Sequence, residues 1–174
     1  SISHAKMLCR SNLLSEIECD KIINILNEML SQAEAGKLKI EKEFEDMHSK
    51  IEYILTDKLG DIGKKIHTAR SRNDQVLVSI QLYLIDELNF IKAEVKSLFD
   101  LLINLAKKNK NIIMPGYTHM RAAMPSSFGL WFSAYAEILI DDVISINSTM
   151  EIINQNTLGS AAGYGTSFNI DRDF

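Results

Sequence analysis

Residues that break helices are scarce in this chain of 174 residues, which contains two prolines and eight glycines. The prolines, Pro115 and Pro125, bracket one short segment, and three glycines fall between Gly159 and Gly165. Long stretches without either residue are typical of helical proteins. The composition therefore predicts an all-α fold with no substantial sheet.

Cysteine is also scarce. Cys9 and Cys19 have no second pair and no flanking histidine, which excludes the common zinc and redox motifs. We expect two unpaired thiols in a reducing cytoplasm. No ligand cluster in the sequence suggests a metal.

The sequence has no run of 18 apolar residues without charges, so it predicts no membrane span. The net charge is −4 and no basic stripe stands out, which argues against nucleic acid as a partner. The chain is long enough for one domain with a hydrophobic core. It begins at Ser1 without a methionine or a signal-peptide pattern, so we expect further sequence before it.

Hydrophobic periodicity predicts two helices in the first third of the chain. The first begins just after Ser15, which has the spacing of a capping box with Glu18, and it ends near Gly36. The second runs from about residue 45 to residue 59. The apolar positions expected to face the core from the first helix are Ile22, Ile25, Leu26, Met29, Leu30 and Ala33.

A third helix is predicted from near Ser71 to about Lys108. A helix of that length measures roughly 55 Å, longer than a small domain is wide, and therefore packs in an extended bundle. A fourth helix is predicted from Pro125 or Ser126 to about Asn154. Its apolar residues occur on every side, which requires burial on every side and hence other subunits. We expect residues 1–70 to form an N-terminal helical segment and residues 71–174 to begin a central long-helix bundle.

Three polar or glycine-rich segments interrupt this scaffold. The first, residues 67–75, reads HTARSRNDQ and lies at a predicted helix start, where backbone N–H groups favour an anion and arginine recognises carboxylates. A well-capped helix start with salt bridges is the alternative interpretation.

The second segment, residues 115–121, reads PGYTHMR and places a histidine in a loop held by prolines, an arrangement suited to proton transfer. A purely structural histidine is the alternative. The third, residues 159–167, reads GSAAGYGTS, whose small residues allow backbone N–H groups to hold an oxyanion. Here the alternative is a plain connector between helices.

Taken in order, these segments resemble the argininosuccinate lyase family of the fumarase/aspartase superfamily. The stretch HTARSRNDQV at 67–76 resembles that family's hallmark, and PGYTHM at 115–120 and LGSAAGYG at 158–165 resemble two further family segments. SISHAKML at the N-terminus and residues 45–48 also match family segments, so the similarity covers nearly the whole chain.

The resemblance implies roles for particular residues. His119 corresponds to the family's catalytic histidine, as base, acid or activator, while Asn73 and Thr118 correspond to substrate contacts. The remaining candidates for substrate binding are Arg70, Ser71, Arg72 and Ser160.

The sequence also departs from the family's pattern. Arg121 and Met124 stand where many members have glutamine, and Thr157 stands where a proline is usual. The serine-bearing signature loop of the family is not in this sequence, so we expect a central, incomplete part of such an enzyme that is inactive by itself.

The family reaction is the reversible β-elimination of argininosuccinate to arginine and fumarate, in arginine biosynthesis. The reaction implied by this resemblance needs neither a metal nor an organic cofactor. The resemblance further implies a homotetramer whose active sites are shared between subunits. The alternatives are another superfamily lyase, such as adenylosuccinate lyase, a catalytically silent crystallin-like homologue, and a helical oligomerisation domain without a site.

Overall fold

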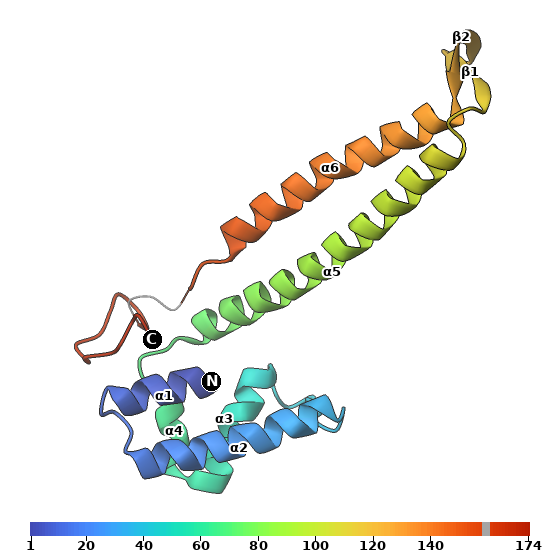
Figure 1. The fold of residues 1–174 in the computed structure, drawn as a ribbon. Coiled ribbons are helices and arrows are strands. Elements are labelled where there is room, and N and C mark those ends of the chain that lie inside the picture. The colour runs from blue at the N-terminus through green and yellow to red at the C-terminus, as the bar shows by residue number, and fades with distance from the viewer. Residues whose placement is uncertain (158–160) are drawn as a thin grey trace. The chain divides into compact units, whose positions relative to one another are not determined.

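The computed structural model describes residues 1–157 and 161–174. The chain forms two compact units, of which unit 1 comprises residues 1–78 and 156–174 and unit 2 comprises residues 79–155. The fold is predominantly helical (Figure 1), as the composition predicted. The predicted boundary at residues 70 and 71 concerns domains of a larger bundle and stays a prediction.

Unit 1 is built on helices α1 (Ile2–Arg10), α2 (Glu16–Glu34) and α3 (Met47–Leu59). Two short turns, α4 (Asp61–Lys64) and the 3₁₀ helix η1 (Lys65–His67), lead from α3 toward the start of α5 (Arg72–Lys108). Periodicity located α2 and α3 but missed α1, which has only nine residues, and the two short turns. Elements this short carry too few apolar repeats to be recognised.

The start of α2 is fixed by the capping box predicted from Ser15 and Glu18. The Glu18 amide donates to Ser15 Oγ at 3.3 Å, and the Ser15 amide donates to Glu18 Oε2 at 2.9 Å. Asp46 caps α3 by accepting from the Ser49 amide at 2.7 Å. Helix α3 therefore begins at Met47, two residues later than predicted.

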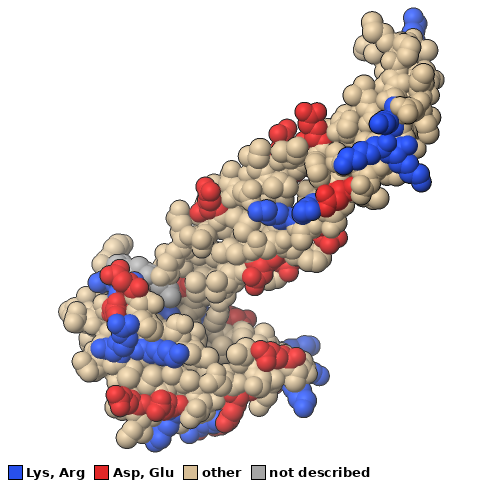
Figure 2. All heavy atoms as spheres, in the orientation of Figure 1, with Lys and Arg blue, Asp and Glu red and all other residues tan. Residues whose placement is uncertain are grey.

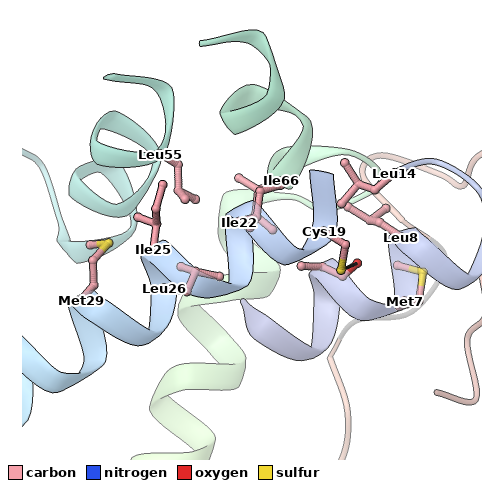
Figure 3. Close-up of a cluster of buried hydrophobic side chains, with 11 residues drawn as sticks. Met7, Leu8, Leu14, Cys19, Ile22, Ile25, Leu26, Met29, Leu55 and Ile66 are labelled. Carbon is pink, nitrogen blue, oxygen red and sulfur yellow. Dashed lines mark hydrogen bonds between the residues drawn. The ribbon is translucent and has the colours of Figure 1, made fainter. Parts of the chain in front are cut away.

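The hydrophobic core of unit 1 is formed by side chains from α1, α2, α3 and η1 (Figure 3). Leu8, Ile22, Leu55 and Ile66 are its largest fully buried members. Four predicted core positions of α2, at residues 22, 25, 26 and 29, are buried as expected. Leu30 and Ala33 are exposed, so their places in the predicted core-facing stripe were wrong.

Unit 2 contains most of α5, a β-hairpin and α6 (Phe128–Ile153). Helix α5 has 37 residues, which confirms the predicted long helix. The hairpin joins the end of α5 to the start of α6, so the two helices run in opposite directions (Figure 1). Lys92 Nζ, near the middle of α5, donates to Asn147 Oδ1 in the C-terminal half of α6 at 2.7 Å and links the two helices.

The hairpin corrects the prediction of a proline-held loop. Strands β1 (Ile113–Thr118) and β2 (Arg121–Ser127) pair antiparallel, with Pro115 opposite Pro125. A ribbon of two strands has only edge strands, where a missing proline N–H is tolerated. Because Pro125 and Ser126 belong to β2, α6 begins later than predicted, at Phe128, with Ser127 Oγ accepting from the Leu130 amide at 3.1 Å.

The described part of unit 2 leaves much of its apolar surface open. Among the described residues of unit 2, Ala106 and Ala136 are the only ones with buried apolar side chains. Large exposed side chains of α6 include Leu130, Trp131, Tyr135, Ile138, Ile140, Ile144 and Ile152. Figure 2 shows charged side chains scattered over the visible faces of both units, with uncharged surface between them.

Gly63 offers a test of the packing between α4 and α3. A Cβ added at Gly63 would collide with the backbone carbonyl of Leu55 and lie 2.7 Å from the Thr56 nitrogen. Ala normally stabilises a helix relative to Gly by up to about 1 kcal/mol. Here we expect Gly63→Ala to destabilise the full-length gene product by about 1–3 kcal/mol, the usual cost of overpacking, measured by denaturant unfolding.

Gly36→Ala is the matched control for this substitution. Nothing lies within 4 Å of an added Cβ at Gly36, and only its positive φ of +67° is penalised. A stabilising effect of Gly63→Ala, or a loss smaller than that of the control, would contradict the close packing of α4 on α3.

Candidate functional site

The polar segment 67–75 spans the end of η1, a short connection and the first turn of α5. Within the connection, Ala69 has a φ of 58°, in the left-handed region. A residue with a Cβ pays about 1–2 kcal/mol for that conformation, so surrounding contacts must hold the turn. The turn is therefore a constrained structure and not a loose linker.

The start of α5 is capped by its own side chains. The Ser71 amide donates to Asp74 Oδ2 at 2.9 Å, and the Asn73 amide donates to Ser71 Oγ at 3.2 Å. This reciprocal pattern resembles a capping box, with aspartate in the place of glutamate. The capped-helix interpretation holds for Ser71 and Asp74. Their side chains accept hydrogen bonds from the Asn73 and Ser71 amides, which could otherwise bind an anion. The side chain of Asn73 is exposed.

Arg70 lies inside unit 1 and is only 4% exposed. Its Nη2 donates to the Ile66 carbonyl at 3.3 Å, while its Nε is buried without a hydrogen-bond partner among the described residues. Burial lowers the pKa of the guanidinium to about 10, and the positive charge of Arg72 acts in the same direction. The carboxylates of Glu52 and Asp74 oppose this shift.

Glu52 of α3 connects the two flanks of the motif. Its Oε1 lies 2.8 Å from His67 Nδ1, and its Oε2 accepts from Arg72 Nη2 at 2.8 Å. The second terminal nitrogen of Arg72, Nη1, lies 3.7 Å from Asp46 Oδ1. Sequence patterns did not point to Glu52, because it stands 15 residues before His67 on a helix with an ordinary pattern.

A cavity of about 180 Å³ lies beside the motif in unit 1. His4 of α1 is among its lining residues, and His4 Nε2 donates to the Thr68 carbonyl at 3.0 Å. The described residues that line it are Ser3, His4, Met7, Ala69, Asp74, Asn156, Ala161, Ile170, Asp171 and Phe174. Residues around 156–157 approach the helix start directly, since Thr157 Oγ1 donates to the Asp74 carbonyl at 3.5 Å.

His119 and Met120 form the two-residue turn of the hairpin in unit 2. Their φ angles are 47° and 63°, and Thr118 pairs with Arg121 across the turn. Two positive φ angles are typical of a type I′ turn, which strongly prefers Asn-Gly. A histidine and a methionine there are strained, and such strain concentrates at functional sites. Met120 is 97% exposed, so burial of its side chain within the chain does not explain the choice.

The predicted site residues thus fall into separate groups. Arg70, Ser71, Arg72 and Asn73 are adjacent in unit 1, whereas Thr118 and His119 belong to the hairpin of unit 2. Ser160 lies outside the described residues. The structure adds Glu52, Asp46 and His4 to the first group. Asp46 and His4 lie in segments that resemble the family but were not singled out as site residues, and Glu52 had no sequence signal.

Two classes of feature are not found in the part of the chain that the structure describes. No group of three or more histidine, cysteine, aspartate or glutamate side chains is arranged to hold a metal ion there. Among the same residues, no helix combines the length and apolar character that a membrane crossing requires.

Comparison with known families places the chain in a class. A family model described as "Lyase" matches residues 1–174, the whole chain. The chain therefore belongs to this lyase family, that of the fumarase/aspartase superfamily.

Particular relatives are named argininosuccinate lyase. The protein from Phocaeicola vulgatus is 49% identical over 173 residues, which cover 99% of this chain and 39% of the relative. The protein from Thermotoga neapolitana is 46% identical over 174 residues, covering 100% of this chain and 44% of the relative. The chain thus spans about two fifths of the length of the curated relatives it matches.

Solved structures share the fold. EDDS lyase in complex with formate matches with a TM-score of 0.85 and 25% identity, over 99% of this chain and 33% of that one. A fumarate lyase:delta crystallin from Brucella melitensis matches with a TM-score of 0.74 and 15% identity, over 89% of this chain and 39% of that one.

The environment of His4 generates a prediction about pH. Burial, followed by the charge of Arg70, lowers the pKa of His4 from 6.5 to about 4. The unfolded chain therefore binds a proton between pH 6.5 and pH 4 that the folded chain does not, and stability falls as the pH falls through that window. Burial also lowers the pKa of His48, which adds to the same slope.

We expect the melting temperature of the full-length gene product to drop between pH 6.5 and pH 5, and His4→Asn to reduce that drop. Carboxylates such as Asp46, whose pKa is lowered chiefly by its bond from the Ser49 amide, lose their contribution only at lower pH. An identical slope in the wild type and the variant would show that His4 does not titrate as its surroundings indicate.

Proposed function

We propose that the protein carrying this chain is an argininosuccinate lyase, a carbon–nitrogen lyase that reversibly converts argininosuccinate into arginine and fumarate. The observation that carries the proposal is the alignment, at 42–49% identity and over at least 99% of the chain, with relatives of that name. We further propose a role in arginine biosynthesis in the cytoplasm.

The reaction requires a base, an acid and a charge-stabilising pocket. A proton leaves the carbon beside a carboxylate, the carbon–nitrogen bond breaks, and its electron pair moves to the departing guanidino nitrogen as the double bond of fumarate forms. The carboxylate is already negative, so the developing dianion needs preorganised donors. Histidine titrates near neutral pH and transfers protons efficiently. We assign proton transfer, as base, acid or activator, to His119, which its strained turn presents at the tip of the hairpin.

Side chains, more than backbone donors, would bind the substrate carboxylates at the motif. The Ser71 and Asn73 amides are already bonded within the helix cap, and Arg72 Nη2 already donates to Glu52. The donors proposed for the substrate are therefore the exposed side-chain amide of Asn73 and the remaining N–H groups of the Arg72 guanidinium. Arginine suits carboxylates because its N–H groups carry positive charge and make charge-assisted hydrogen bonds, which are stronger than neutral ones. Arg70, Ser71, Thr118 and Ser160 stay in the proposal as further contacts.

We propose a homotetramer with active sites shared between subunits. The support is the apolar surface of unit 2, where Leu130 is 63% and Ile138 is 55% exposed. Contiguous apolar surface of this kind marks an interaction site in a folded protein.

A second candidate is another lyase of the same superfamily, such as adenylosuccinate lyase. The likeness to EDDS lyase keeps that class of activity open, and the likeness to a structure titled fumarate lyase:delta crystallin keeps a silent homologue open. The test is to incubate the full-length gene product separately with argininosuccinate, adenylosuccinate and EDDS, and to follow fumarate by its ultraviolet absorbance. Turnover of argininosuccinate alone supports the proposal. Turnover of another substrate, or of none, overturns it.

Replacement of His119 by asparagine tests its chemical role. Asparagine accepts positive φ angles readily, so His119→Asn keeps the turn while removing the imidazole. We expect kcat to fall by roughly 10²-fold or more, the scale of general acid–base catalysis. Near-normal kcat in steady-state kinetics would assign His119 a structural role.

Replacement of Asn73 tests substrate binding at the start of α5. Asn73→Leu keeps the backbone bond from the Asn73 amide to Ser71 Oγ but removes the exposed side-chain amide. We expect kcat/KM to fall roughly 5- to 30-fold. That factor corresponds to a loss of about 1–2 kcal/mol of transition-state stabilisation, as for other lost polar contacts. Asn27→Leu, at an exposed position of α2, is the matched control and should leave kcat/KM unchanged. Equal kinetics for both variants would remove Asn73 from the site.

A further inference from the structure

We propose that Glu52 is a positioning residue for the lyase reaction, which fixes the guanidinium of Arg72 by bridging it to His67. The inference rests on the proposed function, because Arg72 is assigned there to the substrate pocket. Glu52 belongs to α3, outside all three segments that the sequence singled out.

The two oxygens of the Glu52 carboxylate have separate partners. Oε1 is 2.8 Å from His67 Nδ1, and Oε2 is 2.8 Å from Arg72 Nη2. An ionised carboxylate only accepts hydrogen bonds, so His67 carries a proton on Nδ1. One rigid group thus holds a side chain before the Ala69 turn and another side chain after it.

The bridge is partly shielded from water, which strengthens it. The Glu52 and Arg72 side chains are 28% and 29% exposed. Charge-assisted hydrogen bonds at 2.8 Å are stronger than neutral ones, and shielding preserves their electrostatic part. Glu52 also counters the positive charge of the buried Arg70.

Nothing comparable orients Arg72 from another side among the described residues. Its Nη1 is buried without a hydrogen-bond partner there, and Asp46 Oδ1 approaches only to 3.7 Å. An arginine side chain loses conformational entropy when its several rotatable bonds are fixed in one arrangement. The contact with Glu52 holds the Arg72 side chain in place before substrate binds. This matters because misplacement of a binding group by about 1 Å can cost on the order of 10²-fold in rate.

Three variants of the full-length gene product separate positioning from folding. Glu52→Gln keeps the size but removes the charge, and Glu52→Asp keeps the charge but is one methylene too short to reach both partners. Asp57→Asn removes an exposed carboxylate from the same helix without touching the motif, and serves as the control. Melting temperature, kcat and KM for argininosuccinate, and hydrogen exchange of the amides at 68–74 are measured for each.

We expect both Glu52 variants to remain folded, to show faster exchange at 68–74, and to lose on the order of ten- to a hundredfold in kcat/KM. The Asp57 variant should match the wild type in all measurements. The discriminating readout is a double-mutant cycle with Arg72→Gln. If Glu52 acts through Arg72, Glu52→Gln should lower kcat/KM by less than about twofold in the Arg72→Gln background.

Additive losses in that cycle, or a loss of activity that only follows a loss of folded protein, would overturn the positioning role. So would wild-type kcat/KM in Glu52→Gln. If the wild-type protein does not cleave argininosuccinate, the proposed function fails instead. In that case the exchange data still decide whether Glu52 holds the motif, and unchanged exchange at 68–74 overturns the bridge.

Discussion

The geometry of the site region in unit 1 depends on how the chain turns from η1 into α5. Ala69 is held in a left-handed conformation, and the next helix must begin at once. Two sets of interactions enforce this: the cap formed by Ser71 and Asp74, and the Glu52 bridge between His67 and Arg72. Both sets act on residues that flank Ala69, and they therefore bear directly on the direction of Arg72 and Asn73.

The hairpin of unit 2 shows a second use of strain. Its turn requires two positive φ angles, and the chain provides His119 and Met120 where Asn-Gly would be unstrained. Neither strained residue improves the stability of the hairpin by itself. The strain is therefore consistent with selection for the imidazole, which an exposed turn presents outward on a short, well-defined ribbon.

The two units differ in what stabilises them. Unit 1 has a contiguous core from α1, α2, α3 and η1, sufficient to fix the motif against a rigid support. The described part of unit 2 buries few side chains, and its long helices expose leucine, isoleucine and aromatic residues. A chain of this composition gains stability when those faces are covered, which supports the association with other copies proposed above.

The sequence by itself determined the helical class, the lengths of α2, α3 and α5, and the location of the motif at a helix start. Capping pairs and helical periodicity are local, so residues such as Ser15 and Glu18 carry their signal within one or two turns. The candidate residues Asn73 and His119 came from a resemblance, and their roles stay predictions.

Tertiary structure decided what local patterns cannot encode. Glu52 acquires meaning only because the fold brings its carboxylate to His67, 15 residues further along the chain, and Arg70 is buried only in the folded unit, where its Nη2 donates to the Ile66 carbonyl. The hairpin was missed because its prolines and its His-Met turn contradict the usual local preferences, which pairing between strands overrides.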